Sequence, residues 1–189
     1  MNFIQILSFS TSAAVITFLL NQLALAYRER GDKHEKAKYQ GLLLCLTLER
    51  FAIDCADSIS NQSNYDASQG TAGTPFNAMP SLKLPEVEWR LFPLSIVNKV
   101  LSFENEIRDA DAAISFSIEL DLANEGTNEP SAQAGLCGYR AAQLASKIRS
   151  DYDLGKPESP PHGWDHIAFL KKRHDEKIRQ YLPIRDTQQ

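Results

Sequence analysis

The stretch IVNKVLSFENEIRDADAAISFSI, residues 96–118, decides the fold. Its apolar residues recur in steps of three and four, which is the spacing of one face of an α-helix. The pattern predicts a helix of about 30 residues that starts after Pro93, ends near Asn124 and is closed by Gly126. The members of this stripe are Ile96, Val100, Phe103, Ile107, Ala110, Ile114 and Ile118.

Three further segments have helical periodicity. The first covers residues 36–60, the second opens at Pro130 and stops at Gly155, and the third starts around residues 159–161 with a thinner, more polar face. No stretch alternates in the way that a β-strand requires. Four amphipathic helices bury their apolar stripes most simply against one another, so the sequence predicts an all-α bundle of about four helices.

The N-terminal 27 residues contain no Asp, Glu, Lys or Arg. As a helix, the apolar run from Phe3 to Ala26 is about 36 Å long, more than the roughly 30 Å of bilayer hydrocarbon. The run predicts a single transmembrane helix before the bundle. Small residues at a spacing of four would let a second helix approach in lipid, unless their hydroxyls only bond their own backbone. They are Ser8, Ser12, Ala13 and Thr17.

The flanks of this run predict its orientation. No Lys or Arg precedes it, whereas five follow between Arg28 and Lys38, and such charges hold their side in the cytoplasm. We therefore expect the N-terminus outside and the bundle in the cytoplasm. Ala24-Leu25-Ala26 also fits the cleavage pattern of a signal peptide, which would place the bundle on the other side of the membrane.

The remaining chain divides by composition. Residues 1–27 are the predicted anchor, 28–60 a juxtamembrane helix, 61–84 a flexible loop rich in Ser, Asn and Gly, 85–182 the other helices of the bundle, and 183–189 a tail. Trp89 and Phe92 flank the loop. Aromatic residues beside a flexible segment are frequent interface anchors, so these two are the predicted partner-binding residues, with capping of the bundle as the alternative.

Charge is unevenly distributed around a net value of −4. Two basic clusters enclose an acidic middle, an arrangement that argues against nucleic acid as a partner. In an up-down-up-down bundle the two clusters would meet near the lipid and form a basic collar at the membrane surface. The collar residues are Arg28, Arg30, Lys33, Lys36, Lys38, Lys171, Lys172, Arg173, Lys177 and Arg179.

No recognised catalytic or cofactor motif is present, so neither an enzyme nor a cofactor is predicted. His162 and His166 have the i, i+4 spacing of two metal ligands, but a helix start with Asp165 at its cap explains them more simply. The three cysteines form no CxxC pair and are expected to be small core residues, and Gly135 and Gly138 are expected to admit a neighbouring helix.

These features predict a membrane-tethered interaction or scaffolding protein with a cytoplasmic helical bundle. Its expected partners are the membrane, an unidentified protein and a second copy of the chain. The alternative is an exported helical-bundle sensor or ligand-binding protein whose signal peptide is removed. A mature N-terminus at Tyr27 distinguishes the second from the first.

Overall fold

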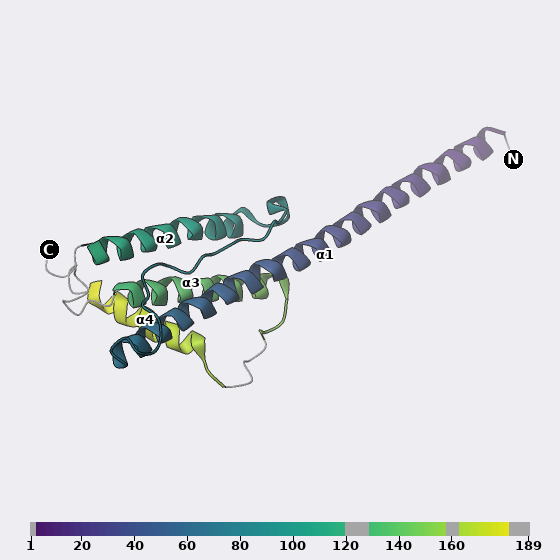
Figure 1. The fold of residues 1–189 in the computed structure, drawn as a ribbon. Helices are drawn as coiled ribbons and strands as arrows, with labels where there is room; N and C mark the ends of the chain where they lie inside the picture. The colour runs from purple at the N-terminus through teal and green to yellow at the C-terminus, as the bar shows by residue number, and fades with distance from the viewer. Residues whose placement is uncertain (1–2, 120–128, 158–162, 182–189) are drawn as a thin grey trace.

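The computed structural model describes residues 3–119, 129–157 and 163–181, and the side chains of residues 18–119, 129–157 and 163–179. Over these ranges the chain is entirely helical apart from its connections, and it contains no strand (Figure 1). The elements are α1 (Phe3–Ala67), the 3-10 helix η1 (Trp89–Leu91), α2 (Leu94–Glu119), α3 (Glu129–Tyr152) and α4 (His166–Tyr181). The predicted all-α bundle of four helices is confirmed.

Helix α1 is one continuous rod of 65 residues. Its C-terminal half lies in the bundle, and its N-terminal half projects alone beyond the other helices (Figure 1). The first buried residue along its described side chains is Ala37. The helix continues to Ala67, so the first seven residues of the predicted 61–84 loop are helical. The polar residues that suggested a loop here belong instead to the last turns of α1. Gln62 donates to Asp66 one turn later, a pair that stabilises the end of the helix.

The remaining connection from α1 to α2 is packed against both helices. The side-chain oxygen of Gln62 accepts the Phe76 N–H at 2.6 Å, and Asp111 of α2 accepts the Met79 N–H at 2.8 Å. Phe76 itself is buried. Farther along, Gln40 accepts the Glu88 N–H at 2.7 Å. The segment therefore returns the chain from the end of α1 to the level of Gln40, where α2 begins.

Helix α3 is the centre of the bundle and packs against α1, α2 and α4. It runs antiparallel to α1, since Cys45 faces Ala145 whereas Cys55 lies against Gly138. Because the long connection brings the chain back first, α2 runs in the same direction as α1 (Figure 1). The up-down-up-down order is therefore wrong: α1, α2 and α4 run away from the projecting N-terminal helix, and only α3 returns.

The core contains the predicted stripes with small displacements. Phe51 of α1 meets Phe103 of α2 edge to face, with ring centroids 5.8 Å apart. The stripe of α2 is buried from Ile96 to Ile114 except at Ile107, which is half-buried against the core. Its expected last member, Ile118, is 44% exposed, and Ser117 takes the inward position. Helix α2 ends at Glu119, so the predicted end near Asn124 and the cap at Gly126 lie outside the described residues.

All three cysteines are free and buried, as expected for small core residues. Burial raises the pKa of the Cys45 and Cys137 thiols from 9.0 to about 12 and raises that of Cys55 well above 9.0. The Sγ of Cys45 donates to the carbonyl of Ala145 at 3.4 Å. A thiol in such surroundings is neutral and a poor nucleophile at neutral pH.

The native chain is therefore expected to leave all three thiols unlabelled by a thiol-specific dye at neutral pH. The raised pKa values stabilise the fold fully below pH 9.0, and that contribution is lost as the pH rises toward about 12, so labelling should appear in that interval. Rates of dye incorporation against pH measure this. The control is Tyr39→Cys, whose position is 65% exposed and should label at once; labelling of the native cysteines at the same rate would contradict the packing.

Candidate functional site

The N-terminal part of α1 exposes apolar side chains that nothing in the structure covers. Every described residue from 18 to 36 is exposed. The large apolar side chains of residues 18–27 are between 52% and 82% exposed, which is unusual for a helix in water. They are Phe18, Leu19, Leu20, Leu23, Leu25 and Tyr27.

Within the part of the chain that the structure describes, no helix is long and apolar enough to cross a membrane. The predicted transmembrane helix thus lacks support from the structure. The side chains of Ser8, Ser12, Ala13 and Thr17, the predicted packing residues of that helix, lie outside the described residues.

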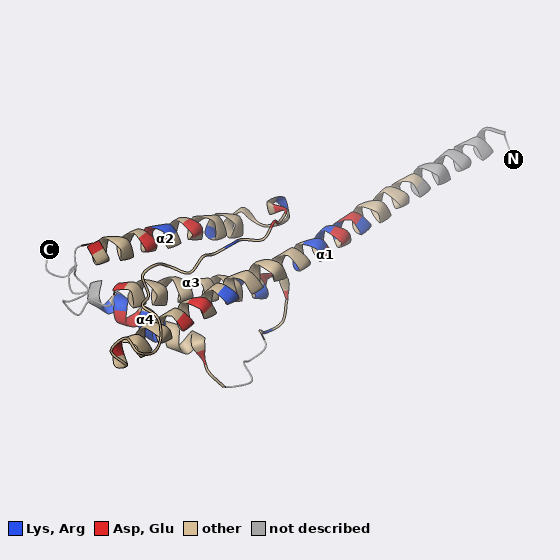
Figure 2. Cartoon of the chain, viewed as in Figure 1, with Lys and Arg blue, Asp and Glu red and all other residues tan. Residues whose placement is uncertain are grey.

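The two basic clusters lie at opposite ends of the bundle (Figure 2). The first occupies the stalk, which we define as residues 28–36, the stretch of α1 between the exposed apolar run and Ala37. In the second, Lys177 is 6% exposed and bonds Glu129 at the start of α3. Glu129 lies beside the end of α1, roughly 30 residues and about 45 Å beyond Lys33. The predicted collar is therefore wrong, because α4 runs away from the stalk.

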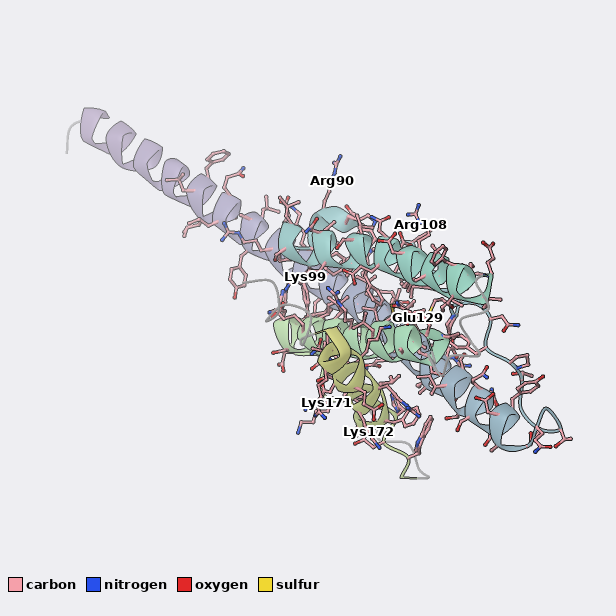
Figure 3. All side chains as sticks on the ribbon, turned by 90° about the vertical axis from the view of Figure 1, so that its left-hand side faces the viewer. Arg90, Lys99, Arg108, Glu129, Lys171 and Lys172 are labelled. Atoms are coloured by element: carbon pink, nitrogen blue, oxygen red, sulfur yellow. The ribbon has the colours of Figure 1, made fainter. Side chains whose placement is uncertain are left out.

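Within the second cluster the charges differ in their surroundings. Lys171 and Lys172 stand on the outer side of α4, across the molecule from Arg90 and Arg108 (Figure 3). Arg173 pairs with Glu176 at 3.3 Å and its guanidinium lies 5.7 Å from the ring centre of Phe169. Arg179 is exposed. Part of this cluster thus holds α4 in place.

The predicted partner-binding aromatics pack into the bundle. Phe92 is 5% exposed and meets Tyr152 edge to face, with ring centroids 5.6 Å apart. Trp89 is half-buried, packs against the core and lies 6.3 Å from Phe92. In the structure, Phe92 thus caps the end of the bundle nearest the stalk, which is the alternative that the sequence left open.

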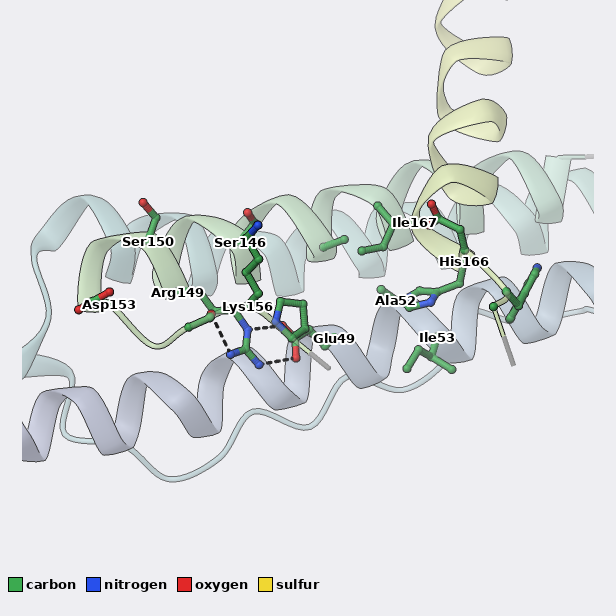
Figure 4. Close-up of a pocket in the computed structure, with 16 residues that line it drawn as sticks. Glu49, Ala52, Ile53, Ser146, Arg149, Ser150, Asp153, Lys156, His166 and Ile167 are labelled. Atoms are coloured by element: carbon green, nitrogen blue, oxygen red, sulfur yellow. Dashed lines mark hydrogen bonds and ion pairs between the residues drawn. The ribbon is translucent and has the colours of Figure 1, made fainter. Parts of the chain in front are cut away.

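A cavity of about 820 Å³ opens between α1, α3, the turn after α3 and the start of α4 (Figure 4). Its wall is mainly apolar, and an ion pair lies at its edge. Arg149 Nε and Nη2 donate to the two carboxylate oxygens of Glu49 at 2.6 and 2.9 Å. Arg149 Nη1 lies 3.4 Å from the carbonyls of Leu154 and Gly155. The apolar wall is formed by Ala52, Ile53, Ala142, Trp164 and Ile167.

The geometry of this cavity does not make a catalytic site. Arg149 is held by Glu49, and this bond raises the pKa of its guanidinium. The carboxylate of Asp165 accepts the Ala168 N–H at 2.9 Å and thereby caps α4. Ser146 and Ser150 are exposed on α3. Arg149 therefore joins α3 to α1 and to the turn after α3, and Asp165 closes the start of α4.

The weak metal hypothesis gains nothing from the structure. His166 lines the cavity 6.2 Å from Trp164, measured between ring centroids. His162 lies outside the described residues. Among the residues that are described, no group of three His, Cys, Asp or Glu side chains could hold a metal ion.

Comparison of the chain with known protein families, curated proteins and solved structures gives no match. Over the residues that the structure describes, the fold defines the class: an all-α bundle of four helices whose first helix projects far beyond the bundle.

Proposed function

We propose that this chain is a membrane-tethered helical bundle, held by the N-terminal end of α1, which presents the bundle to other proteins at the cytoplasmic face. The observation that carries the proposal is the exposed apolar surface from Phe18 to Tyr27 on a helix that has left the bundle. Such a surface is stable only in an apolar environment. The run of apolar residues starts at Phe3, and the charges begin immediately after Tyr27.

The cytoplasmic side follows from the position of the cations, all of which come after the apolar run. Self-association through the small residues Ser8, Ser12, Ala13 and Thr17 is part of the same proposal. A bundle without an evident catalytic arrangement in its cavity fits an interaction role better than an enzymatic one.

The second candidate is an exported ligand-binding protein whose N-terminal segment is removed after Ala26. The cavity beside Arg149 favours it, since its volume and apolar wall suit a small molecule. The two candidates differ in the N-terminus of the mature chain, which is Met1 for the tether and Tyr27 for the exported form.

Removal of residues 1–26 is expected to release the chain from membranes without unfolding it. The intact chain should stay in the membrane pellet after alkaline extraction, and the shortened chain should move to the supernatant. Its helical circular dichroism and melting temperature should persist because the first buried residue on α1 is Ala37.

A second variant, Leu19→Arg with Leu23→Arg, tests the tether in the full-length chain. A charge in the apolar run opposes insertion by about 2.5–3.5 kcal/mol at a helix centre and by less toward the end of the run, where these two residues lie. This variant should weaken membrane retention. An intact chain found in the supernatant, or a mature N-terminus at Tyr27, would overturn the tether.

A further inference from the structure

The stalk carries three cations that make no contact with the bundle among the described residues. Its cations Arg28, Arg30 and Lys33 are exposed, and none has an ion pair among the described residues. Lys36, at the last position of the stalk, is different, because it pairs with Glu88 at 2.5 Å and so holds the segment before η1. Three cations thus stand free between the exposed apolar run and the bundle.

The direction of these cations follows from the helical repeat, since residues seven apart lie on nearly the same side of a helix. Arg30 lies seven residues before Ala37 and fourteen before Leu44, which are 4% and 0% exposed. Arg30 therefore points to the side on which the bundle lies.

Lys33 points in a neighbouring direction. It lies seven residues before Gln40, which accepts the Glu88 N–H just before η1. Arg30 and Lys33 thus point to the side of the stalk on which the bundle begins.

The acidic residues of the stalk lie elsewhere on the helix. Asp32 is seven residues before Tyr39 and fourteen before Leu46, and these are 65% and 49% exposed. Asp32 therefore points away from the bundle, and Glu35, three residues later, lies beside it. Glu29 lies four residues before Lys33 and eleven before Gln40, so it points to nearly the same side as Lys33. The side that faces the bundle thus carries Arg30, Lys33 and Glu29, and the two cations outnumber the carboxylate.

The spacing of the two cations along the stalk places them near a layer of lipid headgroups. Arg30 and Lys33 lie about 4.5 and 9 Å beyond Tyr27 along the helix, and Ala37 about 15 Å beyond it. A headgroup layer adds about 5–7 Å to each side of the hydrocarbon. If Tyr27 marks the edge of the hydrocarbon, Arg30 lies within the headgroups, Lys33 lies just beyond them with a side chain long enough to reach back, and the bundle begins farther out.

We infer that Arg30 and Lys33 bind the headgroups of anionic phospholipids on the bundle-facing side of the stalk, so that the bundle sits on a negatively charged membrane surface. The inference rests on the proposed tether and adds the class of lipid. The charge is complementary, and a lipid with no net charge lacks the attraction that each cation gains near an anionic surface. Lys171 and Lys172 have no part in it, because α4 carries them to the other end of the bundle.

The test uses the full-length chain in phosphatidylcholine vesicles that contain a minority of phosphatidylglycerol. A donor dye is attached at Tyr39→Cys, on the outward side of α1, and energy transfer is measured to either lipid carrying an acceptor on its acyl chain. At low salt we expect transfer to phosphatidylglycerol to exceed transfer to phosphatidylcholine several-fold, and the excess should fall as salt is added.

The variant Arg30→Glu with Lys33→Glu should bring the ratio of the two lipids to about one. The variant Lys171→Glu with Lys172→Glu makes the same change of charge and should leave the ratio unchanged. Flotation with the vesicles is measured in parallel. A chain that does not float overturns both the tether and the lipid site, whereas a chain that floats with a ratio of one, or whose ratio falls equally in both variants, overturns the lipid site alone.

Discussion

Replacing Gly135 and Gly138 together with alanine is expected to lower the free energy of unfolding by up to about 4 kcal/mol. A Cβ at Gly138 would lie 2.8 Å from Cys55 Cβ and 2.9 Å from Leu170 Cδ2. A Cβ at Gly135 would lie 2.5 Å from Arg173 Cβ. Overpacking of this kind costs about 1–3 kcal/mol at each site, and the higher helix propensity of alanine, about 1 kcal/mol, offsets only part of it. Urea unfolding followed by circular dichroism measures the loss.

Gly41→Ala is the matched control, since it makes the same change on a buried face of another helix. There the new Cβ would find its nearest neighbour, Ile148, at 3.6 Å, which is an ordinary van der Waals contact. This variant should be neutral or stabilising by up to about 1 kcal/mol. If the double variant of Gly135 and Gly138 is as stable as Gly41→Ala, then α4 does not lie in the groove that the glycines provide.

The role of these glycines was within reach of the sequence, because glycine inside a strong helical pattern needs a reason and close approach of another helix is the common one. The helices themselves were also readable, since each buries a stripe with a regular period. The outward turn of Ile118 was not, because it depends on where α3 stops covering α2. The period of apolar residues predicts which side of a helix is apolar, but not how far along that side a neighbouring helix covers it.

The order of the helices in space could not be read from the sequence. A short connection makes two helices antiparallel. Residues 68–93 are long enough to place α2 either antiparallel to α1 or, by first running back along it, parallel to it. The structure shows a return, fixed by single hydrogen bonds such as those that the Phe76 and Met79 N–H groups donate to the side chains of Gln62 and Asp111. Local periodicity carries no sign of such bonds. Because α2 runs parallel to α1, α4 runs in the direction opposite to the one predicted, and the two basic clusters lie at opposite ends of the bundle.

The cavity and its ion pair were missed for a related reason. Glu49 and Arg149 are 100 residues apart in the chain, and nothing near either of them indicates the other. The sequence shows only that Glu49 and Arg149 each lie at the border of an apolar stripe, where a long polar side chain can reach an adjacent helix. That position does not select a partner.

Replacing Arg149 with methionine is expected to destabilise the bundle by about 2–4 kcal/mol. The Arg149 side chain is 10% exposed and that of Glu49 is 21% exposed, so the substitution leaves a largely buried carboxylate without its partner. Breaking a fully buried pair in this way costs about 3–5 kcal/mol, and the remaining exposure of Glu49 lowers that figure. The carbonyls of Leu154 and Gly155 lose their contact with Nη1 as well. Unfolding in urea gives the change, and the turn after α3 should become sensitive to protease.

Arg50→Met is the control one residue away from Glu49 on α1. Arg50 pairs with Asp54 at 3.0 Å, but its side chain is 74% exposed, so the loss of this pair should change stability by less than about 0.5 kcal/mol. Adding Glu49→Leu to Arg149→Met should recover part of the loss, because the unpaired carboxylate is then removed too. A double variant that is less stable than Arg149→Met would show instead that packing of the arginine stem, and not the stranded charge, sets the cost.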